Sequence, residues 1–388
     1  MKRDYEYIVL GLGGFGSAAA YWLSRRAGAE VLGLEQFELG HVRGESQDHS
    51  RIIRLSYHTP EYVELAKHAF RAWAEVERDS GERLVLKTGG LDFAHRVSAI
   101  PLTTYSGSMD AAGVSYEKLD AGEIMRRWPP FRLSDDIHGL YQPESGIAMA
   151  ARGNAAHQRM AREHGATLRD RAPVEAIHPG DGEIEVLAGG ATYRCGRLII
   201  AAGAWSNRAL APFGMQLPLT VTQEQVTYFA SARPADFQPE RFPIWIWMDD
   251  PCFYGFPAFG EAGPKVGQDA GGREVAAETR TFEADQAALK RVQDFLARYI
   301  PSALGPIIYT KSCLYTLTPD RDFVLDTLPD HPNVTIAIGG GHGFKFASLI
   351  GRTLAELAVD GRTERNLDPF RIDRAILQLL NPPKHYMV

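Results

Sequence analysis

Three segments of the chain repeat one pattern, in which a short apolar run leads through small or glycine-rich residues into a helical pattern. They are 7-YIVLGLGGFGSAAAYWL-23, 196-GRLIIAAGAWSNRAL-210 and 334-VTIAIGGGHGFKFASLIGRTLAELAVDG-361. A short continuous apolar run is typical of a strand buried on both faces of a parallel sheet. We therefore predict that these strands, each followed by a helix, belong to one sheet of an α/β fold.

A long amphipathic helix is predicted over residues 60–80. Thr59 suits the N-cap, Pro60 suits the first helical position, and Gly81 suits the end of the helix. Its apolar side chains recur at helical spacing, which predicts one buried face. They are Tyr62, Leu65, Ala69, Trp73 and Val76.

The first segment carries the spacing of a dinucleotide-binding turn. Gly11, Gly13 and Gly16 form a Gly-x-Gly-x-x-Gly motif between a predicted strand and a predicted helix. Glycines there let the backbone approach a pyrophosphate, which the N–H groups at the helix N-terminus bind. Glu35 ends the next predicted strand about 20 residues later, where a carboxylate binds the adenosine ribose. This motif alone leaves FAD and NAD open.

Two features favour FAD. The dinucleotide-binding strand and helix come first, and the segments that complete their sheet come far down the chain, a layout common in flavoproteins. The late turn 339-GGGHGFKF-346 also begins a predicted helix and contains Lys345. A helix N-terminus and an ammonium group together create a positive potential that stabilises a reduced, anionic flavin.

The remaining segments differ in character and predict a second domain. They contain strand-like runs such as 244-IWIWM-248 and a helix-like run at 283–300. We expect a two-domain α/β protein, in which a Rossmann-type FAD-binding domain carries an inserted antiparallel-sheet substrate domain. The predicted FAD-binding domain comprises residues 1–81, 146–214 and 311–388, and the predicted substrate domain comprises residues 82–145 and 215–310.

Composition narrows the choice of partners. The 388 residues carry a formal net charge of −6 with no basic cluster, which argues against binding nucleic acid or an anionic membrane. No apolar run reaches membrane-spanning length, and no signal-peptide or peroxisomal pattern is found at the ends. The three cysteines are far apart, which argues against a disulfide framework and, with no histidine close by, against a metal site. We expect a cytoplasmic protein.

A set of short motifs carries a resemblance that spans the chain. The most specific are 313-CLYTLTPDRDFVLD-326 and 341-GHGFK-345; the others, in order, are the glycine motif with Glu35, 50-SRIIRLSY-57, 142-QPESG-146, 200-IAAGAWSN-207, 253-FYGFP-257 and Lys265. This order resembles the monomeric sarcosine oxidase and N-methyltryptophan oxidase family. The resemblance implies a two-domain flavoprotein oxidase that acts as a monomer on a small amine and dioxygen. It also implies that Cys313 links covalently to the FAD, whereas an isolated cysteine is more often a small buried hydrophobe.

The same resemblance implies roles for charged residues. Arg54 and Lys345 match the residues that hold the substrate carboxylate, and Arg51 matches an arginine close to the flavin ring. Arg51 would share a face with Arg54 if that segment were helical. The alternative for Arg51 is a surface or interdomain salt bridge, which is the more ordinary role of an arginine. Lys265 matches the lysine that activates oxygen, although by itself it reads as a surface residue. Tyr254 and Tyr315 match tyrosines that line the substrate cavity, or they simply pack.

Departures from the family leave the substrate open. Asp269 stands where sarcosine oxidases have a histidine, Trp245 stands where they have a methionine, and 44-GESQDHSR-51 replaces a segment richer in serine and histidine. We expect Trp245 to reshape the substrate pocket, and Asp269 to meet a cationic substrate group or a neighbouring arginine. The expected cofactor-binding residues are Gly11, Gly13, Gly16, Glu35, Ser50, Arg51, Val174, Gly203, Trp205, Cys313, Gly341, Gly343, Phe344 and Lys345.

The predicted reaction is oxidation of a secondary amine of an amino acid, with release of hydrogen peroxide. For sarcosine the imine hydrolyses to glycine and formaldehyde. The alternatives are an oxidase of a cyclic or bulkier amino acid, pipecolate-like or N-methyltryptophan-like, and a flavin dehydrogenase. A protein that only binds FAD or NAD would not need Cys313, Arg54 and Lys345 together.

Overall fold

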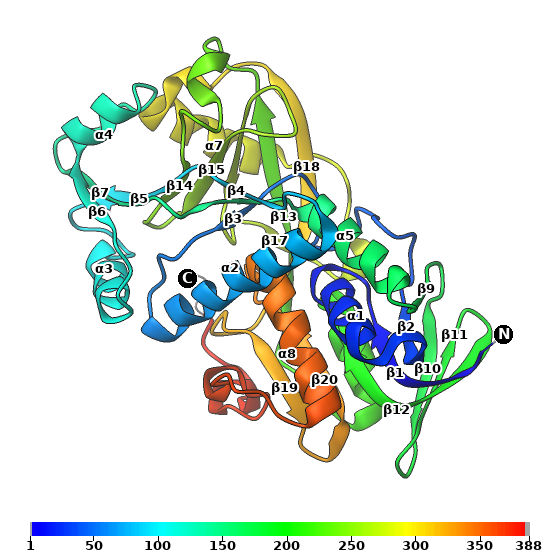
Figure 1. Ribbon diagram of the computed structural model, residues 1–388. Helices are drawn as coiled ribbons and strands as arrows, with labels where there is room; N and C mark the ends of the chain where they lie inside the picture. The colour runs from blue at the N-terminus through cyan, green and yellow to red at the C-terminus, as the bar shows by residue number, and fades with distance from the viewer. Residues whose placement is uncertain (1, 385–388) are drawn as a thin grey trace.

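The fold is known from a computed structural model that describes residues 2–384. Its first sheet has eight strands, with β10, β11, β12, β1, β2 and β9 in spatial order; β20 also pairs with β12, and β19 pairs with β20 (Figure 1). The strands are β1 Asp4–Leu10, β2 Val31–Leu34, β9 Thr167–Arg169, β10 Val174–Pro179, β11 Ile184–Ala188, β12 Ala191–Ile200, β19 Val324–Leu328 and β20 His331–Ile338.

The three strands predicted to share a sheet do so, because β12 pairs in parallel with β1 on one side and with β20 on the other. Their central residues are wholly buried, as the continuous apolar runs predicted. Helix α1 packs against α5 and α8, and α2 also packs against α8. These helices are α1 Gly14–Ala27, α2 Pro60–Ser80, α5 Ala150–Glu163 and α8 Ala347–Asp360.

The ends of α2 follow the predicted caps. The Thr59 side chain accepts a hydrogen bond from the Tyr62 backbone N–H, Pro60 is the first helical residue, and Gly81 is left-handed with φ +70°. The five apolar positions predicted for its inner face are all buried. The sequence pattern therefore defined both the bounds and the orientation of this helix.

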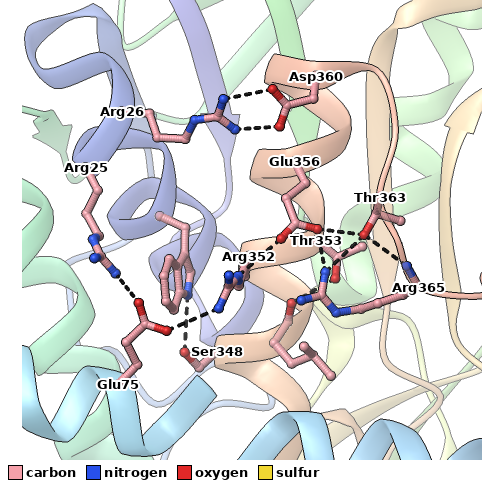
Figure 2. A network of polar contacts seen from close by, with 12 residues as sticks. Arg25, Arg26, Glu75, Ser348, Arg352, Thr353, Glu356, Asp360, Thr363 and Arg365 are labelled. Atoms are coloured by element: carbon pink, nitrogen blue, oxygen red, sulfur yellow. Dashed lines mark hydrogen bonds and ion pairs between the residues drawn. The ribbon is translucent and has the colours of Figure 1, made fainter. Parts of the chain in front are cut away.

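Ion pairs join the outer surfaces of α1, α2 and α8 (Figure 2). Glu75 of α2 pairs with Arg25 of α1 at 2.9 Å and with Arg352 of α8 at 3.1 Å, and Arg26 of α1 pairs with Asp360 of α8 at 2.6 Å. All of these side chains are partly exposed, so each pair contributes little to stability, about 0–1 kcal/mol.

A second sheet of nine strands forms the other lobe of the molecule (Figure 1). Its spatial order is β17, β13, β16, β15, β14, β5, β7 and β6, with β18 also paired to β13, and only β5 and β14 run parallel. The predicted antiparallel sheet is thus confirmed with one parallel pair. The strands are β5 Gly90–His95, β6 Glu117–Asp120, β7 Ile137–Gln142, β13 Thr220–Phe229, β14 Ile244–Trp247, β15 Phe253–Ala258, β16 Pro264–Gln268, β17 Arg273–Glu274 and β18 Ile307–Leu317.

The boundary predicted between residues 310 and 311 falls inside β18. This strand pairs with β13 from Ile307 to Leu317, so residues 311–317 belong to the second sheet. A small third sheet is formed by β3 Arg51–Ile53, β8 Gly146–Ala148 and β4 Val85–Lys87, in this spatial order. The remaining helices are α3 Leu102–Ala111, α4 Ala121–Arg127, α6 Ser206–Leu210 and α7 Gln286–Tyr299. No helix within residues 2–384 is long and apolar enough to cross a membrane.

Candidate active site

The glycine turn after β1 forms one end of a large cavity. Gly11 has φ +85°, and a Cβ atom on Gly16 would lie 1.7 Å from the Gly11 carbonyl oxygen, so a side chain at residue 16 would break the turn. The Glu35 carboxylate accepts hydrogen bonds from the backbone N–H groups of Leu12 at 2.9 Å and Phe37 at 3.1 Å. The carboxylate therefore sits beside the turn and at the cavity wall, as a ribose-binding residue requires.

The cavity has a volume of about 310 Å³ and runs from this turn to the second sheet. Most of the predicted site residues contribute to its lining. They are Gly11, Gly13, Glu35, Arg51, Arg54, Val174, Gly203, Trp205, Tyr254, Lys265, Asp269, Tyr315, Gly341, Gly343, Phe344 and Lys345.

Four predicted residues do not line the cavity. Gly16 packs against the Gly11 carbonyl oxygen within the turn. Ser50 is buried, and its carbonyl oxygen accepts a hydrogen bond from Lys265 Nζ. Cys313 is buried on β18, two residues before Tyr315, which does line the cavity.

Trp245 lies on the face of β14 that points away from the cavity, so the prediction that it reshapes the substrate pocket is wrong. Its ring stacks on Phe295 of α7 at a centroid distance of 5.4 Å, within the core of the second domain. Its neighbour Ile246 lines the cavity instead. Trp245 therefore does not narrow the substrate pocket.

Arg51 and Arg54 both reach the cavity, although not through a helical turn. Residues 51–53 form strand β3. Arg51 donates hydrogen bonds to the backbone carbonyl oxygens of Ser50 at 2.9 Å and Glu45 at 2.7 Å, which fixes its guanidinium group.

Arg54 and Lys345 together provide a positive wall. The Arg54 guanidinium pairs with Asp92 at 3.2 Å, and its Nε atom is buried without a hydrogen-bond partner. Within residues 2–384, no side chain or backbone oxygen accepts a hydrogen bond from Lys345 Nζ, which lies 5.6 Å from the centroid of the Tyr57 ring. Burial, and then the charge of Arg54, lowers the pKa of Lys345 to about 7. A bound carboxylate would supply the missing counter-charge.

Asp269 meets an arginine, which was one of the two outcomes expected for it. Arg321 Nη1 lies 2.7 Å from Asp269 Oδ2, and the Arg321 side chain is wholly buried. Arg321 has φ +60° and its Nε donates to the Gly340 carbonyl oxygen at 3.3 Å. The Asp269 carboxylate is still about one-fifth exposed, so it presents an anchored acceptor to the cavity.

Lys265 lies at the cavity wall on β16 and is not a surface residue. Its Nζ atom lies 3.0 Å from Asp48 Oδ2 and 2.7 Å from the Ser50 carbonyl oxygen, and the Phe256 ring centroid is 4.1 Å away. Burial lowers its pKa to about 8, while Asp48 acts to raise it. A fixed ammonium beside a redox site is suited to stabilise negative charge that develops on a small acceptor.

The Cys313 thiol is buried near Arg51. Burial raises its pKa to about 11, and the Arg51 charge acts in the opposite direction. The thiol is therefore mainly protonated at neutral pH, and Arg51 is the cation that favours the thiolate.

Several polar residues of this region were missed by sequence reasoning. Asp92 pairs with Arg54, Asp48 pairs with Lys265, and Arg321 pairs with Asp269. Asp48 and Arg321 stand inside motifs that were recognised, but nothing in their local sequence distinguishes a buried ion pair from a solvated loop.

Comparison with known proteins decides the family. The model of the family described as FAD dependent oxidoreductase matches residues 6–357. The chain belongs to this family. It is 37% identical over 390 residues to a monomeric sarcosine oxidase of Streptomyces avermitilis, covering 97% of this chain and 100% of the relative. It is 31% identical over 376 residues to the N-methyl-L-tryptophan oxidase of Salmonella arizonae, covering 95% and 99% respectively.

A solved structure supports the same assignment. An open form of NikD, described as an unusual amino acid oxidase essential for nikkomycin biosynthesis, superposes with a TM-score of 0.85 at 26% identity, covering 95% of this chain and 98% of NikD. The family resemblance predicted from the motifs is thus confirmed, and the chain is a flavin-dependent oxidoreductase. The glycine turn, the Glu35 carboxylate and the cavity that joins them to the second sheet fit FAD.

Proposed function

We propose that the chain oxidises the secondary amine of an amino acid, of the N-methyl type that sarcosine represents, and uses dioxygen as acceptor. One observation carries the proposal: Lys345 and Arg54 both line the cavity, and Lys345 Nζ has no hydrogen-bond or ion-pair partner within residues 2–384. A substrate carboxylate satisfies both cations. The names of the sarcosine and N-methyltryptophan oxidases support the same class of substrate.

Bound FAD would supply an acceptor for a hydride from the carbon next to the substrate nitrogen, and dioxygen would be the final acceptor of the two electrons. Arg54 and Lys345 orient the substrate through its carboxylate, and Tyr254 and Tyr315 enclose it. Burial disfavours a charged amine and so increases the fraction of neutral, reactive amine. The released imine hydrolyses, which gives glycine and formaldehyde if sarcosine is the substrate.

Lys265 is proposed to act in the reaction with dioxygen. Its ammonium group is fixed at the cavity wall, where it stabilises the negative charge that develops as dioxygen is reduced to hydrogen peroxide. This position favours an oxidase over a dehydrogenase that donates electrons to another protein.

Cys313 is proposed to hold the flavin covalently, through a thioether between its Sγ and the 8α carbon. The support is its burial on β18 close to Arg51, together with the family motif around it. Arg51 would lower the cost of forming the thiolate that adds to the 8α carbon. That addition would leave the flavin reduced by two electrons, which dioxygen would then accept.

A cyclic or bulkier amino acid is the second candidate, and Asp269 favours it. The anchored carboxylate suits an N–H donor on a substrate whose carboxylate binds Arg54 and Lys345 at the same time. The Trp245 ring lies outside the cavity, in the core of the second domain, which leaves room for a larger substrate side chain. A cytoplasmic monomer stays the expectation for either substrate.

Peroxide release from a panel of compounds tests the proposal. We expect activity with an N-methyl amino acid or a cyclic amino acid, and much weaker activity with the matching amine that lacks a carboxylate. The Asp269→Asn variant should impair a cyclic substrate more than a linear one. Peroxide formation only from primary amines, or from none of these compounds, would refute the assignment.

A further inference from the structure

The Lys265 ammonium group forms an ion pair with a carboxylate that does not line the cavity. Asp48 Oδ2 lies 3.0 Å from Lys265 Nζ, and both side chains are almost completely buried. Lys265 lines the cavity and Asp48 does not. Asp48 therefore contacts the amine on the side that a substrate or cofactor does not reach.

Asp48 is itself fixed in place. The Tyr228 hydroxyl lies 3.0 Å from each carboxylate oxygen and donates its hydrogen to the carboxylate, and the Tyr228 side chain is wholly buried. Asp48 also has φ +84°, a conformation that residues other than glycine adopt only at a cost. The chain thus keeps an aspartate at a backbone position that glycine would occupy without strain.

We infer that Asp48, fixed by Tyr228, is a positioning residue that holds the Lys265 ammonium group at the cavity wall and keeps it charged. The inference rests on the proposed role of Lys265 in the reaction with dioxygen.

The surrounding charges show why a counter-ion is needed. Arg51 Nη1 lies 3.9 Å from Asp48, so one carboxylate serves two cations. Without Asp48, Lys265 and Arg51 would be buried together, and only the lysine can release its proton at ordinary pH. The other titratable groups near this cluster are Tyr228 on β13 and Tyr309, Lys311 and Cys313 on β18, while His49 and Glu261 pair at its outer edge. Glu45 lies near Arg51; its carboxyl group accepts a hydrogen bond from the Thr316 hydroxyl, and burial raises its pKa to about 7.

These other groups do not replace Asp48. Burial raises the pKa of both Tyr228 and Cys313, so neither is an anion at neutral pH. Lys311 is a further cation, and Glu261 is engaged by His49 at 3.2 Å. Loss of Asp48 should therefore lower the pKa of Lys265 further below its ordinary value.

The test uses two substitutions in the flavin-loaded protein. Asp48→Asn keeps the shape and accepts the Tyr228 hydrogen bond, and Asp48→Gly removes the charge at a backbone position that glycine tolerates, so at least one should fold. Glu261→Gln is the matched control, because it removes a nearby carboxylate outside the ion pair. Each protein is reduced anaerobically with substrate and mixed with oxygenated buffer from pH 6 to pH 10, and the flavin absorbance of the resting protein is titrated over the same range.

We expect reoxidation of the wild type to slow as pH rises through about 8, where Lys265 loses its proton. In Asp48→Asn and Asp48→Gly this midpoint should move about 1–3 pH units toward acid, because an opposite charge at contact distance shifts a pKa by that amount. The spectral transition should move equally and disappear in Lys265→Met, whereas Glu261→Gln should keep both midpoints.

The inference would be overturned if the midpoint of the pH dependence of reoxidation did not move toward acid in either Asp48 variant. It would also be overturned if reoxidation of the wild type did not slow as pH rises through about 8. If Lys265→Met leaves reoxidation unchanged, the proposed role of Lys265 fails instead. The two failures are therefore separate.

Discussion

Replacing Lys345 with methionine tests the positive wall of the cavity most sharply. Methionine keeps the length and apolar stem of the side chain but removes the one cation of the Arg54–Lys345 pair that has no hydrogen-bond or ion-pair partner within residues 2–384. A hydrogen bond to a charged group is worth about 1.5–3 kcal/mol, so carboxylate binding should weaken about 10- to 150-fold.

The effect should depend on pH in a defined direction. The pKa of Lys345 is lowered to about 7, and a bound carboxylate raises it. Affinity for a carboxylate should therefore be full below pH 7 and fall as pH rises above 7, toward the higher pKa of the complex. Lys345→Met should lose this pH dependence and bind weakly throughout.

The assay is a spectral titration of the loaded protein with a carboxylate that has no amine, such as acetate or propionate, from pH 6 to pH 9. Lys290→Met is the matched control, because Lys290 lies exposed on α7, where it pairs with Asp294. The assignment of Lys345 would be refuted if Lys345→Met bound the carboxylate with an unchanged dissociation constant. It would also be refuted if the affinity of this variant still fell as pH rises above 7.

Four further changes address other parts of the site and the fold. Lys265→Met should leave anaerobic bleaching by substrate nearly intact and slow reoxidation by several orders of magnitude, as measured by stopped flow; the reverse pattern would contradict its role. Cys313→Ser should release flavin into the supernatant on acid precipitation, whereas the wild-type pellet should stay yellow; an unmodified Cys313 peptide from fully loaded wild type would disprove the thioether. Gly16→Ala should abolish FAD loading, measured by absorbance, because its methyl group would collide with a backbone carbonyl oxygen. Asp360→Asn should leave the midpoint of unfolding in urea almost unchanged, because its pair with Arg26 is exposed, and a clear fall in that midpoint would contradict this.

The features that sequence could predict are those fixed by local pattern. Gly11 and Gly16 between an apolar run and a small-residue helix define the dinucleotide turn, and Thr59 and Gly81 define the ends of α2. Backbone constraints of this kind act over a few residues, so they can be read without the fold.

Pairings across the two domains could not be predicted in the same way. The run 244-IWIWM-248 is apolar on both faces, so alternation does not tell which face meets the ligand, and Trp245 was placed on the wrong one. Asp48 and Lys265 are 217 residues apart, and their contact depends on how β16 lies against the loop before β3. Only the tertiary arrangement decides such contacts.

The central claim is that the cavity selects an amino acid by its carboxylate and oxidises the adjacent amine. The most direct measurement is anaerobic mixing of the loaded protein with an N-methyl or cyclic amino acid and, separately, with the same amine lacking its carboxylate. We predict loss of flavin absorbance with the amino acid only, followed on admission of oxygen by recovery of the absorbance and one equivalent of hydrogen peroxide. Equal bleaching by the simple amine, or no bleaching by any secondary amino acid, would contradict the account.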